Sequence, residues 1–202
     1  MEILDKKKVL LIPPLPEIYF KKIKEIEKLI ELVDEITVND FGTFNYFKKL
    51  EIKINLGRQI IKSKTGMMDK KIINSINKED LEEMKELLIS EFLINKVKDK
   101  INLLELNPII QGINLKENFN YSLYWPFILN STTFMCWSNV DNKFFRVMNC
   151  NTLCKKSVGK FLNDDYLLIG NQTLLENKEK LDDYLKKIKN NELIKRIVFL
   201  NY

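Results

Sequence analysis

The chain has 202 residues, 45% of them hydrophobic and 30% charged, with a net charge of +5. This composition is that of a globular domain with a core of its own, and no apolar run reaches the roughly 18 residues that span a bilayer. Histidine is absent, which excludes serine–histidine and cysteine–histidine catalysis and histidine metal sites within this chain. The N-terminal residues lack the apolar stretch of a signal peptide, so we expect a cytoplasmic protein without a membrane anchor.

The first half of the chain alternates between strand and helix patterns. Residues 8–12 form an aliphatic run that ends at two prolines, which predicts a strand buried on both faces. Apolar residues recur at helical spacing over 17–32, and β-branched residues alternate over 34–39 and again over 51–56. Strand, helix, strand, short helix and strand is the order of a parallel α/β sheet.

The second half continues with longer elements. Asn77 is the predicted N-cap of a helix over 80–97, and a strand follows over 102–106. Residues 121–134 are aromatic and β-prone but are interrupted by Pro126. The remaining patterns predict a strand over 166–169, a helix over 174–188 and a final strand over 196–200.

The charged residues are mostly lysines that alternate with glutamates, as over residues 21–28, which is typical of a solvated helix face. A nucleic-acid surface is therefore not favoured. Most of the basic residues are lysines. The three arginines, Arg58, Arg146 and Arg196, are therefore candidates for sites that need a planar guanidinium group, which can donate two parallel hydrogen bonds.

Three cysteines, Cys136, Cys150 and Cys154, lie within nineteen residues at a spacing of Cys-x13-Cys-x3-Cys. Free cysteines are commonly buried as small apolar side chains. Clustered thiols in a polar segment instead favour a metal or iron–sulfur site, and both interpretations stay open. Zinc would need a fourth ligand that no histidine supplies. A radical S-adenosylmethionine motif is excluded because its third thiolate position is occupied by Ser157.

Polar residues also follow three of the predicted strands. Asn39 and Asp40 follow the second strand, Arg58 follows the third, and Glu105 and Asn107 end the fourth. Ligand sites of parallel α/β folds gather at the carboxyl ends of strands, so these five residues form a candidate substrate site. The alternative is turn chemistry, with Asp40 serving only as a helix cap.

These segments together resemble the collagenase-like U-32 peptidase family, including its members that assist oxygen-independent hydroxylation of ubiquinone or of RNA. The resemblance rests on five segments between about residues 33 and 155. They are Val-Asn-Asp-Phe-Gly at 38–42, Leu-Gly-Arg at 56–58, Leu-Glu-Leu-Asn at 104–107 with Gln-Gly-Ile at 111–113, Tyr-Trp-Pro at 124–126 with Thr-Thr at 132–133, and the closing Cys-x3-Cys.

The resemblance implies a (β/α) barrel-like fold and a four-cysteine iron–sulfur cluster, three of whose ligands correspond to Cys136, Cys150 and Cys154. The family's N-terminal half and its additional cysteine have no counterpart here, and Phe134-Met135 replaces its arginine after the threonine pair. We therefore expect an incomplete or open barrel core over residues 1–120 and a cysteine-bearing lobe over 121–202.

Three functional hypotheses follow. The first is an iron–sulfur protein that takes part in a hydroxylation or other redox modification, and the second is a non-catalytic scaffold or binding subunit. A peptidase is ranked last, since no nucleophile can be assigned. An incomplete barrel leaves strand edges open, so we expect a homo-oligomer or a longer homologous partner subunit. We also expect the cysteine sulfurs to lie within roughly 7 Å of one another, and Arg58 to contact Asp40 or Glu105.

Overall fold

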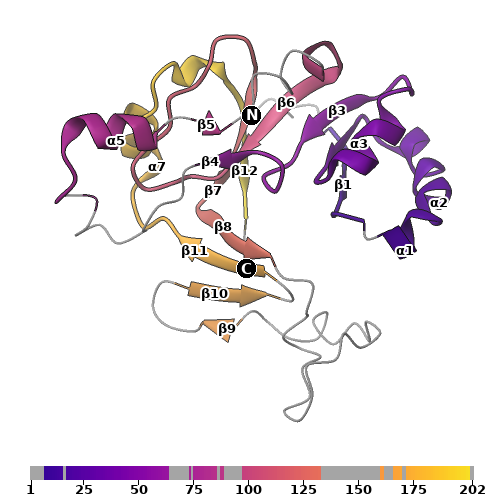
Figure 1. Ribbon diagram of the computed structural model, residues 1–202, viewed down its shortest axis with the longest axis horizontal. Helices are drawn as coiled ribbons and strands as arrows, with labels where there is room; N and C mark the ends of the chain where they lie inside the picture. The colour runs from indigo at the N-terminus through magenta and orange to yellow at the C-terminus, as the bar shows by residue number, and fades with distance from the viewer. Residues whose placement is uncertain are drawn as a thin grey trace, which may run out of the picture.

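The computed structural model of the protein describes residues 7–15, 17–63, 73, 75–85, 87–88, 97–132, 160–161, 166–169 and 172–200. These residues form a mixed α/β fold (Figure 1). A six-stranded parallel sheet curls into a half-barrel, helices flank its outer face, and a four-stranded antiparallel sheet lies beneath it. The predicted class, an open α/β barrel-like fold, is confirmed at this level.

The half-barrel sheet is built from strands that follow one another in sequence. Its order is β1 (Val9–Ile12), β2 (Glu35–Val38), β3 (Lys53–Leu56), β6 (Ile101–Leu106), β7 (Tyr121–Trp125) and β12 (Ile194–Phe199), and every neighbouring pair is parallel. All six correspond to predicted strands. Because β7 and β12 belong to this sheet, it extends across the boundary expected at residue 120.

The first predicted helix, over 17–32, is divided into three short pieces. They are α1 (Glu17–Phe20), α2 (Ile23–Glu27) and the 3-10 turn η1 (Ile30–Leu32). Ile23 is 3% exposed, whereas Leu29 and Leu32 are 45% and 65% exposed. A long helix depends on an apolar face that is buried along its whole length, and only one turn here has such support.

Two other predicted helices are shorter than the sequence pattern indicated. The helix α5 (Lys78–Met84) starts at its predicted cap, Asn77, but Leu87–Leu88 form β5, which pairs with β4 (Lys62–Ser63). Residues 89–96 lie outside the described residues. The predicted helix over 174–188 is wrong at its start, because β11 (Gln172–Glu176) occupies that segment and the helix α7 spans Leu181–Lys186.

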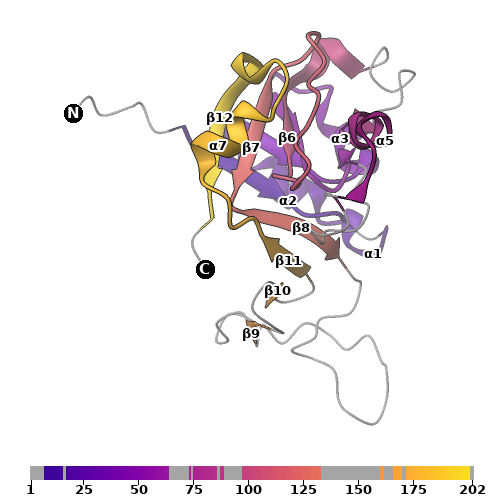
Figure 2. The same cartoon turned by 90° about the vertical axis from the view of Figure 1, so that its left-hand side faces the viewer.

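The second sheet begins where β7 ends. After a cis Trp125–Pro126 bond the chain enters β8 (Phe127–Thr132), which pairs with β11 in the antiparallel order β8-β11-β10-β9. Strands β10 (Tyr166–Ile169) and β9 (Lys160–Phe161) complete this sheet, which lies below the half-barrel in Figure 2. The second sheet therefore adjoins the carboxyl end of the parallel strands.

Successive side chains of a strand point to opposite sides. The parallel strands therefore have an apolar outer face and, except in the wholly aliphatic β1, an inner face with polar side chains. The main core lies on the outer side, where the strands pack against the helices, and its fully buried members include Ile36, Val38, Phe44, Phe47, Ile54, Leu104, Leu106, Leu123 and Tyr184. The helix α3 (Phe41–Phe47) supplies Phe44 and Phe47 to it. The inner face is thus left to other side chains.

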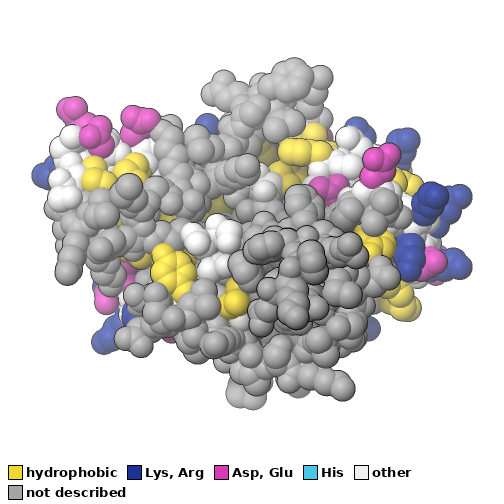
Figure 3. Space-filling view, turned by 60° about the horizontal axis from the view of Figure 1, so that its bottom comes forward, with side chains coloured by type: hydrophobic (Ala, Val, Ile, Leu, Met, Phe, Trp, Pro, Cys, Tyr) yellow, Lys and Arg dark blue, Asp and Glu magenta, His cyan; other side chains and the backbone are white. Residues whose placement is uncertain are grey.

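Charge on the outside of the molecule is distributed over the helices. Figure 3 shows lysine side chains at the end that carries α1 and α2, with acidic side chains between them, and further acidic side chains at the end that carries α5. This distribution agrees with solvated helix faces. In the described part of the chain, no helix is long and apolar enough to cross a bilayer.

Candidate binding site on the inner face of the half-barrel

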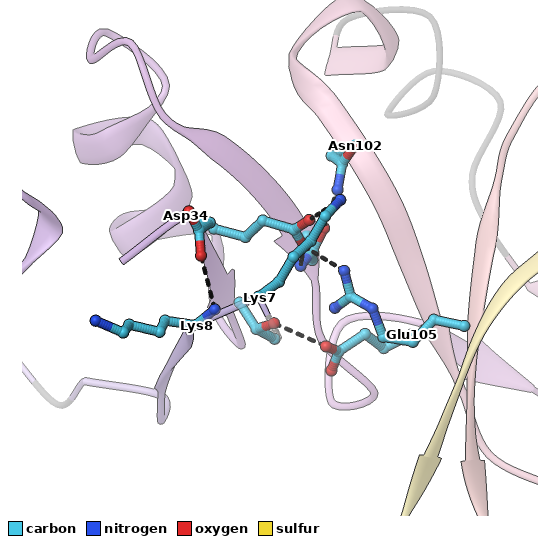
Figure 4. Close-up of polar contacts among 9 residues, drawn as sticks. Lys7, Lys8, Asp34, Asn102 and Glu105 are labelled. Atoms are coloured by element: carbon cyan, nitrogen blue, oxygen red, sulfur yellow. Dashed lines mark hydrogen bonds and ion pairs between the residues drawn. The ribbon is translucent and has the colours of Figure 1, made fainter. Parts of the chain in front are cut away.

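A cavity of about 770 Å³ lies along the inner face of the half-barrel. Its charged lining consists of Lys7, Glu35, Glu105, Lys195 and Arg196, contributed by the segment before β1 and by β2, β6 and β12. Figure 4 shows polar contacts around Lys7 and Glu105 and their neighbours. We call this set of charged side chains the inner-face network.

Glu35 is the centre of the network's amino-terminal half. Its side chain is 1% exposed and accepts hydrogen bonds from Arg196, from Asn55 Nδ2 at 3.0 Å and from Lys7 Nζ at 3.3 Å. Asn102 Nδ2 in turn donates to Asn55 Oδ1 at 2.9 Å. Burial raises the pKa of Glu35, but the hydrogen bonds from Arg196, Asn55 and Lys7 outweigh it, so the pKa lies below its ordinary value. Glu35 is therefore a buried, ionised carboxylate.

Glu105 is the second buried carboxyl group, 2% exposed, and lies deeper along the sheet on β6. Thr37 Oγ1 donates to its Oε1 at 2.7 Å, and Tyr124 on β7 also hydrogen bonds to it. Burial raises the pKa of Glu105, and the hydrogen bonds from Thr37 and Tyr124 only partly compensate. Burial also raises the pKa of Tyr124, and the charge of Glu105 adds to that rise. Glu105 thus holds a proton more readily than an exposed glutamate does.

Arg58 lies at the carboxyl end of β3 and joins the two sheets. Its Nη1 donates to the Phe127 carbonyl at 2.9 Å and to Asn107 Oδ1 at 3.2 Å, and its guanidinium lies 4.2 Å from the centre of the Tyr124 ring. Its charge lowers the pKa of Glu105. Arg58 is therefore near Glu105, while its predicted contact with Asp40 or Glu105 stays a prediction.

Asn107 links the same region to the second sheet. It is 6% exposed, and its Oδ1 accepts from Arg58 and from the Leu129 backbone N–H at 2.8 Å. Its position after β6 is the one expected for a ligand-binding residue. In the structure its oxygen holds β8 against the end of the half-barrel.

Asn39 and Asp40, at the end of β2, make contacts that shape the backbone. Asn39 Nδ2 donates to the Ile12 carbonyl at 3.0 Å. Asp40 is the N-cap of α3, accepting from Thr43 N at 2.7 Å, from Thr43 Oγ1 at 2.6 Å and from Leu15 N at 3.1 Å. The turn-chemistry alternative accounts for these contacts, and neither residue lines the cavity.

The cysteines Cys136, Cys150 and Cys154 lie outside the described residues, and so does Thr133 of the threonine pair. Their predicted convergence stays a prediction. Within the ranges that the structure describes, no three metal-ligating side chains come together. The inner-face network, in the part of the chain that the structure describes, consists of side chains that interact through hydrogen bonds and charge.

Comparison with protein-family models, with characterised proteins and with solved structures yields no match for this chain. The U-32 resemblance therefore stays a prediction from the sequence motifs. The chemistry of the site has to be argued from its own geometry.

Glu105 was predicted from the sequence as a site residue, whereas Lys7, Glu35, Thr37 and Tyr124 were not. A usable signal was present, because Glu35 and Thr37 alternate with apolar residues in a strand that is buried at all four positions. A polar residue at every second position of such a strand indicates an inner face with partners on other strands. The scarcity of arginine did point to Arg196, which pairs with Glu35.

The Ser122 hydroxyl lies between the two halves of the network. Ser122 is aligned with Glu105 on one neighbouring strand and with Arg196 on the other, is 0% exposed, and makes no hydrogen bond within the described residues. We expect Ser122→Ala to raise the free energy of unfolding by about 1 kcal/mol, because it removes an unpaired buried hydroxyl. Urea unfolding measures this, with exposed Ser131→Ala as a neutral control. A loss of stability would mean that the hydroxyl has a partner.

Proposed function

We propose that the chain binds a small organic molecule in the inner-face cavity and that Glu105 exchanges a proton with it. The observation that carries this proposal is a carboxyl group, 2% exposed, that lines a cavity of about 770 Å³. Cavities of roughly 300–1,000 Å³ are the usual size for small-molecule sites.

The surroundings of Glu105 suit proton exchange. Thr37 and Tyr124 fix its position by hydrogen bonds, and burial raises its pKa, so it can carry a proton closer to neutral pH than an ordinary glutamate. A buried acid with a shifted pKa in a cavity is the common arrangement of a general acid or base. Tyr124 and Arg58 lie beside it and would respond to a change in its charge.

Ligand-observed NMR with a library of small polar fragments tests the proposal. Fragments should bind and compete with one another, and their affinity for the wild-type protein should change with pH above 4.5, the ordinary pKa of glutamate. In Glu105→Gln this dependence should be lost, whereas exposed Glu79→Gln on α5 should retain it. Binding that is equally pH-dependent in Glu105→Gln would contradict the role of Glu105. An absence of binders would contradict the site.

The thiol cluster supports a second candidate function. Cys136, Cys150 and Cys154 follow β8, which leaves the carboxyl end of the half-barrel, and three clustered thiolates without histidine suit iron–sulfur ligation. We propose that they hold a cluster that takes part in an oxygen-independent hydroxylation or other redox modification, with the fourth ligand from a small molecule or a partner. Anaerobic purification with iron and sulfide assays and a visible spectrum tests this. A colourless, metal-free protein would favour the scaffold alternative.

The open edges of the half-barrel support the proposal of a partner. Among the described residues, β1 pairs with β2 alone and β12 with β7 alone, and Leu11 and Phe199 on these edges are 58% and 62% exposed. Natural proteins usually cover or charge such edges. We expect a second copy or a longer homologous subunit to pair there. Size-exclusion chromatography with light scattering should give a mass above 24.0 kDa, and a stable monomer at all concentrations would refute the homo-oligomer.

A further inference from the structure

The amino-terminal end of the cavity carries an excess of positive charge. Lys7, Lys195 and Arg196 lie there, with Glu35 as the carboxylate that faces them. Glu35 is already neutralised by its contacts with Arg196 and Lys7. The amides of Asn102 and Asn120 also line this end and can donate hydrogen bonds. An anionic group is the complement of this arrangement.

Arg196 is suited to hold such an anion. Its side chain is 23% exposed, and its contact with Glu35 uses one terminal nitrogen, Nη2. A guanidinium has five N–H donors in a planar fork that matches carboxylate and phosphate groups. Donors of Arg196 therefore remain to face the cavity while Glu35 holds the side chain in position.

The wall of the cavity beyond these charges is aliphatic. Val9, Leu11, Leu103 and Val198 line it, and Val9 and Leu11 are 40% and 58% exposed although they belong to a strand of four aliphatic residues. Exposed aliphatic side chains beside a charged pocket favour a ligand with a hydrocarbon portion, because covering them releases water from apolar surface. A purely ionic ligand would leave this wall in water.

The deep end of the cavity limits the ligand to one anionic group. Glu105 lies there and accepts a hydrogen bond from Thr37, which is two residues further along β2 than Glu35. Tyr124 on β7 hydrogen bonds to it, and the charges of Arg58 and Arg196 already act on it. A second carboxylate placed there would be repelled by Glu105 in its ionised form. The two ends of the cavity therefore differ in chemistry.

Resting on the function proposed above, we propose that the ligand is an amphiphile with a single anionic headgroup. Its carboxylate or phosphate group lies against Lys7 and Arg196 at the amino end of the strands. Its hydrocarbon portion lies along Val9, Leu11 and Val198, and its far end reaches Glu105. A free organic acid and a phosphate monoester share this chemistry, and the test separates them.

Four probes of equal chain length test the proposal on the 202-residue chain: octanoate, octyl phosphate, octylamine and octanedioate. Binding is followed by titration calorimetry and by backbone amide shifts. Octanoate or octyl phosphate should bind at least tenfold more tightly than octylamine and octanedioate. The tighter of the two identifies the anionic group. The backbone amides of β1, β2 and β12 should shift on binding.

Matched variants locate the anion. Arg196→Lys keeps the charge that neutralises Glu35 but removes the planar guanidinium group. It should weaken the binding of octanoate or octyl phosphate about tenfold. Lys7→Gln, at a side chain that is 57% exposed, should weaken them about threefold with little effect on folding. Lys186→Gln removes an equal charge from α7, where the side chain is 75% exposed, and should change nothing.

The outcomes distinguish this inference from the proposed function. Octylamine or octanedioate binding as tightly as octanoate would overturn the single anionic headgroup, while the cavity would still be a ligand site. Binding that is unchanged in both Arg196→Lys and Lys7→Gln would overturn the placement of the anion. If the four probes fail but polar fragments bind in the Glu105-dependent way described above, the amphiphilic class is wrong and the proposed function stands. If nothing binds, both are refuted.

Discussion

Replacing Arg196 with alanine should lower the free energy of unfolding by about 3 kcal/mol. Its partner Glu35 is 1% exposed, and removing one member of a buried ion pair leaves the other charge uncompensated, which typically costs about 3–5 kcal/mol. We expect the lower end of that range because Arg196 is 23% exposed and Asn55 and Lys7 still contact Glu35. Urea unfolding at pH 7 measures the effect.

The double variant Glu35→Gln with Arg196→Met is the matched control. It removes both charges together, and an apolar or neutral replacement of a buried pair is often close to neutral in stability. The double variant should therefore be more stable than Arg196→Ala alone. If Arg196→Ala lowers the free energy of unfolding by less than about 1 kcal/mol, the ion pair behaves as an exposed one. The description of Glu35 as the centre of the network would then be wrong.

The pH dependence of this effect has a definite sign. The pKa of Glu35 in the folded protein lies below its ordinary value of 4.5, so its contribution to stability is present above pH 4.5 and is lost as the pH falls through the folded pKa. The stability difference between wild type and Arg196→Ala should accordingly shrink in acid. A difference that grows below pH 4.5 would contradict an ionised Glu35.

Replacing Gly57 with alanine should cost about 3 kcal/mol, the upper part of the usual range for overpacking. A β-carbon at Gly57 would lie 2.1 Å from Asn39 Oδ1 and 2.6 Å from Asn39 Cγ. The amide cannot move aside freely, because it donates to the Ile12 carbonyl and accepts from Gln59 N at 3.4 Å. The turn after β3 would therefore have to separate from the end of β2. Thermal and urea unfolding measure the loss.

Gly42→Ala provides the comparison within the same chain. Its β-carbon would lie 3.1 Å from Asp40 Oδ1, a tight contact but not a severe one, and alanine is favoured over glycine within a helix such as α3. We expect a change of less than about 1 kcal/mol. Adding Asn39→Ala to Gly57→Ala should cost less than the sum of the two single changes, since the clash is then absent. Full additivity would argue against this contact.

These contacts show which parts of the fold the sequence could predict. The strands β2 and β3 were predicted from their alternating β-branched residues. The expectation that the aliphatic first strand is buried on both faces was wrong, because Val9 and Leu11 are 40% and 58% exposed. The helix predicted over Leu174 and Leu175 was also wrong. A short apolar segment has no distinguishing period, and pairing with β8 and β10 places these leucines in β11.

The site was harder to predict than the fold because its members come from distant segments. Asn39, Asp40 and Asn107 stand at strand ends, where site residues and turn residues have the same composition. In the structure their hydrogen bonds hold the backbone together. The inner-face network instead joins Glu35 to Arg196, 161 positions away in the sequence. A local sequence pattern cannot predict a contact between residues so far apart.

The same separation has a consequence for the synthesis of the protein. A ribosome releases β1, β2, β3, β6 and β7 before β12, so the nascent chain presents Glu35 to a forming sheet while its arginine partner has not yet been translated. Burying the Glu35 carboxylate before Arg196 is present would cost free energy. We therefore expect the earlier strands to pack fully only after β12 has been synthesised. A transcript truncated before β12 would yield a chain that cannot complete its interior, and cellular proteases remove such chains.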